Sequence, residues 1–366
     1  MKLRRIEVAP FRIPYRRPVV IGGVAVAARI GLLVQGHGDD GLVGLGEVAP
    51  HPTAGDETLH DATRAIAKIQ EALLTVGPIE IDFPLPDRLE IVPSAAARAG
   101  LEMACWDLAA QSAGVPVSQM LGAMVTERIP VNAIVDQQEP SAAATAAREL
   151  VAEGFRCLKL KVSHDLVGDA ARVAAVRAAT GPEINIRLDA NGIWTVDEAT
   201  AAISRLAVHG LEYVEQPVRK MADLAHVRRV VETPIAADES VTDADSVRRL
   251  AAMEAADIVV VKPALLGLSN AAAVVRAARA CGLNVVVTSV LDTSIGIAAA
   301  LHLAATLPRP VLPCGLATAS LLVGDLVRQP LVPYGGWLSV PQGPGLGIQL
   351  DAAAVRRWCC DSAHAE

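Results

Sequence analysis

The chain has 366 residues, of which 52% are apolar and 20% charged, and its formal net charge is −7. Its aromatic side chains are few (four Trp, three Tyr and three Phe), and acidic and basic residues are interspersed, so we do not expect a nucleic-acid partner. A chain of this length usually forms more than one domain.

The N-terminal residues 1–18 alternate charged and apolar side chains and lack the continuous apolar segment of a signal peptide. The most apolar later stretch, residues 294–307, is too short to cross a bilayer and contains His302. We therefore expect a cytoplasmic protein with no membrane partner. The six cysteines have no CxxC spacing, which favours buried free thiols over a zinc site.

Residues 1–125 are predicted to form an α+β capping domain. Strand-like segments at 4–14, 28–40 and 41–50 indicate an antiparallel meander, and the glycine-rich sequence GHGDDG supplies one turn. Two helical segments follow, at 56–74 and 94–114. The turn-rich residues 326–366 are expected to return to this domain.

Residues 126–325 repeat one pattern, a short β-branched run followed by an alanine-rich amphipathic segment. We predict eight strands, at 128–136, 156–163, 184–191, 211–217, 233–240, 257–264, 283–290 and 310–317. Strands that are apolar on both faces and alternate with helices are typical of a parallel sheet covered by helices. The fold class is therefore α/β, a (β/α)8 barrel without a regular final helix.

Charged residues stand at the C-terminal ends of five successive predicted strands. They are Lys161, Asp189, Glu215, Asp238 and Lys262. Barrel enzymes place their chemistry at this end of the strands, so the five side chains are expected to converge. A single charge at a strand end is often only a surface ion pair, but five at matching positions favour an active site.

Three carboxylates at one point need a compensating cation. Oxygen ligands without imidazole or thiolate favour Mg²⁺, with Mn²⁺ as a possible substitute. A lysine beside a divalent ion and away from bulk water has a lowered pKa and can act as a base. Such a site suits removal of a proton next to a carboxylate, a pattern known for lysine and magnesium in enolase-type sites.

At these positions the chain resembles the enolase superfamily, specifically its muconate-lactonizing-enzyme subgroup. The resemblance rests on GLVGLGEVAP, KLK, DAN, EQP, ADES and VVVKPALLG and covers nearly the whole length. It implies that magnesium is bound by Asp189, Glu215 and Asp238. It also implies that Lys161 is the acid/base residue and that Lys262 faces it from the opposite side. Lys159 would help to lower the pKa of Lys161, and Asn191 and Glu239 would contact the metal ligands without binding the metal themselves.

The segments VVVTSVLDTSIGIAAALHLAA and LPCGLATASLLVGDLV are similar to those of o-succinylbenzoate synthases. This resemblance implies a dehydratase of menaquinone biosynthesis that works through an enediolate. N-Succinylamino acid racemase, dipeptide epimerase and muconate-type cycloisomerase are alternatives, because the same site serves several reactions, and a non-catalytic barrel is a further one. The epimerases typically carry a pair of aspartates for the substrate ammonium group, whereas here only Asp292 is available. The family commonly has glutamate at that position and serine at the position of Thr288.

The expected substrate is a small carboxylate. Candidates for contacting it are Ser289, at the end of the seventh predicted strand, and Asp292 and Thr293, just after it. The capping-domain candidates are Gly22 and Gly23 in one loop and Thr53 in another, although the first loop is equally compatible with a plain hairpin. A homo-oligomer is possible.

Overall fold

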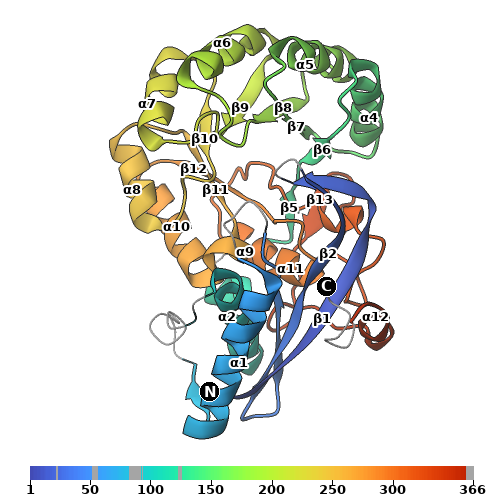
Figure 1. Cartoon of the computed structure of the whole chain (residues 1–366), viewed down its shortest axis with the longest axis vertical. Coiled ribbons are helices and arrows are strands. Elements are labelled where there is room, and N and C mark those ends of the chain that lie inside the picture. The colour runs from blue at the N-terminus through green and yellow to red at the C-terminus, as the bar shows by residue number, and fades with distance from the viewer. Residues whose placement is uncertain (22–23, 52–56, 82–91, 93, 123–125, 360–366) are drawn as a thin grey trace.

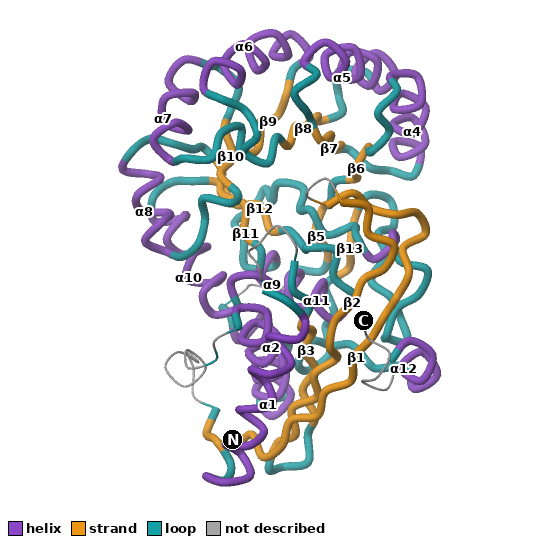
Figure 2. Tube along the Cα trace, viewed as in Figure 1, coloured by secondary structure: helices purple, strands orange, loops and turns teal. Residues whose placement is uncertain are grey.

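The computed structural model describes residues 1–21, 24–51, 57–81, 92, 94–122 and 126–359. A helix-covered sheet and a smaller domain lie side by side (Figure 1). The long strands of the smaller domain run along the flank of the molecule (Figure 2).

The capping domain is a four-stranded antiparallel sheet covered by helices. The sheet order is β3–β2–β1–β4, with β1 Lys2–Ile21, β2 Val24–Gly38, β3 Val43–Val48 and β4 Ile79–Glu80. The helices are α1 Leu59–Val76, α2 Ala95–Ser112 and α3 Val117–Met120. A capping box between Thr58 and Asp61 fixes the start of α1, as this residue pair does at many helix N-termini. The predicted meander is present.

Seven parallel strands form the curved sheet of the second domain. In chain order they are β6 Ala133–Val135, β7 Cys157–Lys161, β8 Asn185–Asp189, β9 Leu211–Glu215, β10 Ile235–Ala237, β11 Ile258–Val261 and β12 Asn284–Val287. The helices of this domain are α4 Pro140–Ala152, α5 Leu166–Thr180, α6 Val196–Leu206, α7 Met221–Val230, α8 Ala244–Ala252, α9 Pro263–Leu266, α10 Leu268–Ala280 and α11 Ser294–Ala304. Helices α4 to α8 and α10 follow the outer wall of the sheet (Figure 1).

The first and eighth predicted runs differ from expectation. The first divides into β5 Arg128–Pro130, which pairs antiparallel with β13 Trp337–Ser339, and β6. The eighth contributes only single bridges, from Cys314 to Val131 and from Gly315 to Thr288. Pro310 and Pro313 lack the amide hydrogens that a ladder needs, which accounts for the missing strand. These bridges connect the two edges of the curved sheet, near β6 and β12.

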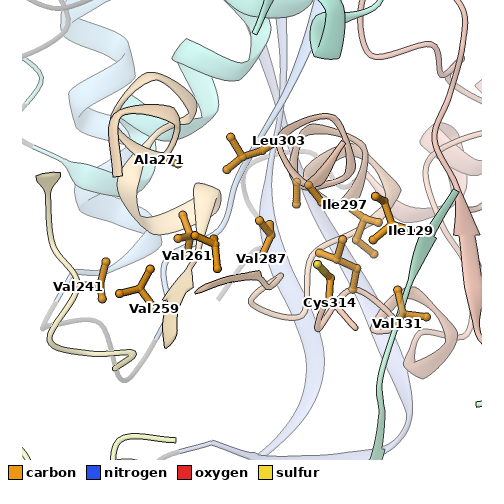
Figure 3. Packing of buried hydrophobic residues seen from close by; sticks show 14 of the residues in the cluster. Ile129, Val131, Val241, Val259, Val261, Ala271, Val287, Ile297, Leu303 and Cys314 are labelled. Carbon is orange, nitrogen blue, oxygen red and sulfur yellow. The ribbon is translucent and has the colours of Figure 1, made fainter. Parts of the chain in front are cut away.

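Strand alternation separates two apolar layers. Val259, Val261 and Val287 pack in one cluster with Ala271, Ile297 and Leu303 of the covering helices (Figure 3). A separate cluster holds Tyr213, Ala236, Ile258, Val260 and Val286. Because neighbouring residues of a strand face opposite sides, this second set lies inside the barrel. Residues two positions further along share that interior face.

The chain after α11 returns to the capping domain. Leu322 forms a bridge with Tyr15, and Cys359, just after α12 Ala352–Trp358, forms one with Phe11 of β1. Within the described residues no helix is long and apolar enough to span a membrane.

Candidate active site

Strand register places the charged residues next to one another. Lys161 is opposite Asp189 in the β7–β8 pair, and Asp189 is opposite Glu215 in the β8–β9 pair. Asp238 follows β10, two residues beyond the interior residue Ala236, and Lys262 follows β11, two residues beyond the interior residue Val260. The five side chains therefore share the interior of the barrel at its C-terminal end.

Lys159 joins two of the predicted metal ligands. Its Nζ lies 2.8 Å from Oε1 of Glu215 and 3.0 Å from Oδ2 of Asp189. Both carboxylates are buried, with 1% and 3% of their surface exposed. Burial alone would lower the pKa of Lys159, but the charges of Asp189 and Glu215 outweigh it and raise that pKa. Lys159 is therefore a partly buried ammonium ion.

The two proposed acid/base lysines have different partners. Lys262 Nζ lies 2.5 Å from Oδ2 of buried Asp238. Lys161 is exposed, and its Nζ donates to Oδ1 of Asn191 at 3.1 Å. Asn191 in turn donates through Nδ2 to Oε1 of Glu239 at 3.1 Å, so these residues form a continuous hydrogen-bonded row.

The carboxylates differ in their electrostatic surroundings. Burial raises the pKa of Glu215 to about 8, although Lys159 opposes the shift. For Asp189 burial acts in the same direction, but Lys159 and Lys161 overcome it and lower the pKa. Lys262 was expected to have a lowered pKa beside a metal ion. With its carboxylate partners alone its pKa is raised, because Asp238 and Glu215 outweigh burial.

The donor set fits a hard divalent cation. Three buried carboxylates at consecutive strand ends offer only oxygen ligands, which Mg²⁺ prefers. Among the described residues no three His, Cys, Asp or Glu side chains form a ready metal cage, and the carboxylate oxygens are paired with the ammonium groups of Lys159 and Lys262. A divalent ion would replace those contacts at the same oxygens.

Family models match both parts of the chain. Residues 5–122 match the model described as mandelate racemase / muconate lactonizing enzyme, N-terminal domain, and residues 142–354 match the one described as enolase C-terminal domain-like. The chain belongs to the enolase superfamily. It falls in the muconate-lactonizing-enzyme subgroup of that superfamily.

Relatives of this enolase-superfamily chain carry several activities. The o-succinylbenzoate synthase of Thermobifida fusca (strain YX) is 46% identical over 221 residues, 60% of this chain and 68% of the relative. The hydrophobic dipeptide epimerase of Enterococcus faecalis is 32% identical and covers 95% of this chain and 99% of its own. A solved structure of the Enterococcus faecalis V583 dipeptide epimerase, complexed with Mg and the dipeptide L-Leu-L-Tyr, has a TM-score of 0.86 and 30% identity, covering 95% of this chain and all of that one.

Three residues that adjoin the candidate site were not singled out by the sequence analysis. Gln216, in the left-handed region with a φ of 36°, accepts from the Asp238 amide at 2.8 Å and so holds that ligand's backbone. His51 follows β3 in the capping domain. Burial lowers its pKa to about 4, and the charges of Arg29, Lys262 and Lys161 act in the same direction. The EQP motif was a signal for Gln216, whereas isolated residues such as His51 and Arg29 gave none.

The predicted substrate contacts are distributed differently. Ser289 is half-buried, and its hydroxyl lies 2.7 Å from that of Thr318. Asp292 and Thr293 are buried and bonded to Arg29 and Glu47 of the capping domain, so we withdraw them as direct substrate contacts. Gly22, Gly23 and Thr53 lie outside the described residues.

Proposed function

We propose that this enolase-superfamily enzyme is a magnesium-dependent o-succinylbenzoate synthase. It would dehydrate 2-succinyl-6-hydroxy-2,4-cyclohexadiene-1-carboxylate, a step of menaquinone biosynthesis. Asp189, Glu215 and Asp238 would hold the metal, and Lys161 and Lys262 would face the substrate from two sides.

The observation that carries this proposal is that the described ends of the seventh and eighth runs offer no unpaired carboxylate for a substrate amine. Asp292 is bound by Arg29 at 2.9 Å, and residues 314–318, at the end of the eighth run, are Cys, Gly, Leu, Ala and Thr. An ammonium group buried beside them would have no counterion, which costs several kcal/mol. A dicarboxylate substrate without an amine therefore suits the part of the site formed by residues 314–318 better than a dipeptide does.

The residues supply the proton transfers of a dehydration. Lys161, as a neutral amine, takes the proton from the carbon next to the carboxylate, and the C–H electrons move toward that carboxylate. Their return forms the new C=C bond and breaks the C–O bond to the hydroxyl, which leaves as water with the proton now on Lys161. Asn191 fixes the Lys161 amine at 3.1 Å, and Lys262 acts as a positive charge on the opposite strand. When bound, magnesium would supply positive charge beside the substrate carboxylate.

Racemisation of N-succinylamino acids is the second candidate. The chain retains lysines on two opposite strands, β7 and β11, as transfer of a proton between two faces requires. A succinylated amine carries no positive charge, so the uncharged residues 314–318 are compatible with racemisation of such substrates. The full-length similarity to epimerases supports the same alternative.

A paired assay tests the proposal. Purified protein with Mg²⁺ would receive the cyclohexadiene substrate, followed by its absorbance, and N-succinyl amino acids in deuterated water, followed by NMR of the α proton. We expect rapid dehydration and slow exchange. Exchange without dehydration would contradict the synthase proposal and make Lys161 and Lys262 a two-base pair. An Asn191→Ala variant should slow whichever reaction occurs, because Lys161 loses its hydrogen-bond partner.

A further inference from the structure

A buried polar cluster joins the capping domain to the turn after β12. We call it the cap clamp and define it as Arg29 of β2, Glu47 of β3, and Asp292 and Thr293 of the turn. All four side chains are buried, with exposures of 5% or less. Charged groups are seldom fully buried unless they are paired and hydrogen-bonded, because their desolvation is costly.

Arg29 holds the turn through its guanidinium. One Nη donates to Oδ1 of Asp292 at 2.9 Å and lies 3.4 Å from the Ala49 carbonyl. The other oxygen of Asp292 accepts from the Val290 amide at 3.1 Å, inside the turn itself. Asp292 thus connects the capping domain to the backbone of the turn.

Glu47 holds the other end of the turn. Its carboxylate accepts from the Thr293 amide at 3.0 Å, from the Thr293 hydroxyl at 2.6 Å and from the Gly296 amide at 3.2 Å. These amides belong to the first turn of α11, where a negative charge is favoured by the helix dipole. The two capping strands therefore hold the C-terminal end of the turn and the start of α11.

The residue directly before these anchors is strained. Leu291 has a φ of 68°, in the left-handed region that branched and bulky side chains rarely adopt. Such conformations persist where surrounding contacts over-determine them, and they gather at functional sites. Arg29 and Glu47 supply such contacts at Asp292 and Thr293, directly after Leu291, and the Asp292 carboxylate also accepts from the Val290 amide directly before it.

The turn adjoins the proposed reaction site. The Thr288 amide donates to the carbonyl of Val261 at 2.9 Å, and Val261 directly precedes Lys262. Ser289, the proposed substrate contact, opens the turn.

We propose that Arg29 and Glu47 are positioning residues, which hold the turn Ser289–Thr293 in the conformation that binds the substrate carboxylate. This rests on the proposed function for the identity of the substrate. The barrel mouth is therefore completed by the capping domain even where that domain does not touch the substrate. A purely structural role would stabilise the fold without affecting substrate binding.

Two variants separate these roles. Arg29→Met removes the guanidinium and leaves two buried carboxylates, whereas the double variant Arg29→Met/Asp292→Asn also removes one of those charges. The double variant should recover part of the stability, but both variants lack the Arg29 contact that holds residue 292 of the turn. Arg5→Met, which removes an arginine from an exposed ion pair with Glu7, is the matched control.

We expect both variants to raise KM for the cyclohexadiene substrate at least ~10-fold, with kcat reduced far less, because misplacement of a binding group removes binding energy. Magnesium affinity should stay unchanged. Amide exchange of segment 288–297 should be faster in both variants than in Arg5→Met. Recovery of wild-type KM by the double variant, or unchanged exchange in this segment, would overturn the proposal. If wild-type protein dehydrates nothing, the proposed function fails, and the exchange comparison alone decides the clamp.

Discussion

Replacing Lys159 with methionine should show how much this ammonium group stabilises the buried carboxylates of Asp189 and Glu215 in the absence of metal. The Lys159 side chain is 16% exposed and lies within 3.0 Å of two carboxylates that are almost fully buried. Breaking a buried ion pair by removing one partner costs about 3–5 kcal/mol, because the remaining charge is uncompensated. We expect metal-free Lys159→Met to lose that much free energy of unfolding.

Magnesium should restore much of this loss, because it brings positive charge to the same carboxylates. Binding at 100 times Kd stabilises a protein by about 2.7 kcal/mol, and the gain should be larger in Lys159→Met than in wild type. The assay is denaturant unfolding with and without Mg²⁺. The exposed Lys220 provides the control, since Lys220→Met should change stability by less than about 0.5 kcal/mol. A loss below about 1 kcal/mol in metal-free Lys159→Met, or an equal gain from Mg²⁺ in variant and wild type, would refute this reasoning.

Three further predictions address single residues. Lys161→Ala should reduce kcat by about 10²–10⁴-fold while calorimetry shows unchanged Mg²⁺ binding, and appreciable residual turnover would remove Lys161 as the base. Asp238→Asn should weaken Mg²⁺ binding at least ~10-fold by calorimetry, and unchanged affinity would argue against a three-carboxylate site. His302 is fully buried, and burial lowers its pKa from 6.5 to about 4, so the folded state binds fewer protons than the unfolded state. Stability should therefore be complete above pH 6.5 and fall by about 3 kcal/mol as the pH drops toward 4. In metal-free protein, His302→Gln should flatten this dependence, and an unchanged slope would assign the effect to other groups.

The sequence predicted the strand ends well because their signals are local. A two-residue period and a regular strand-plus-helix spacing placed Lys161, Asp189 and Glu215 at one end of a parallel sheet, and the structure brings their strands together in that register. The capping meander followed from turn chemistry in the same way. Local patterns thus carried most of the fold.

Other features depend on partners far away in the chain. Asp292 looked like a substrate contact because it follows a barrel strand, but Arg29, 263 positions earlier, binds it instead. Nothing within a short window around Asp292 indicates that partner. The eighth run was overestimated for a different reason, since its apolar residues fit a strand while Pro310 and Pro313 prevent a regular ladder.

The most direct test of the proposed active site is the dehydration rate as Mg²⁺ is added back to chelator-treated wild-type protein. If the strand-end carboxylates hold a metal that the reaction needs, turnover is absent without Mg²⁺ and rises over the same concentrations as Mg²⁺ binding measured by calorimetry. Full turnover in metal-free protein would contradict the account, because three converging carboxylates would then have another purpose.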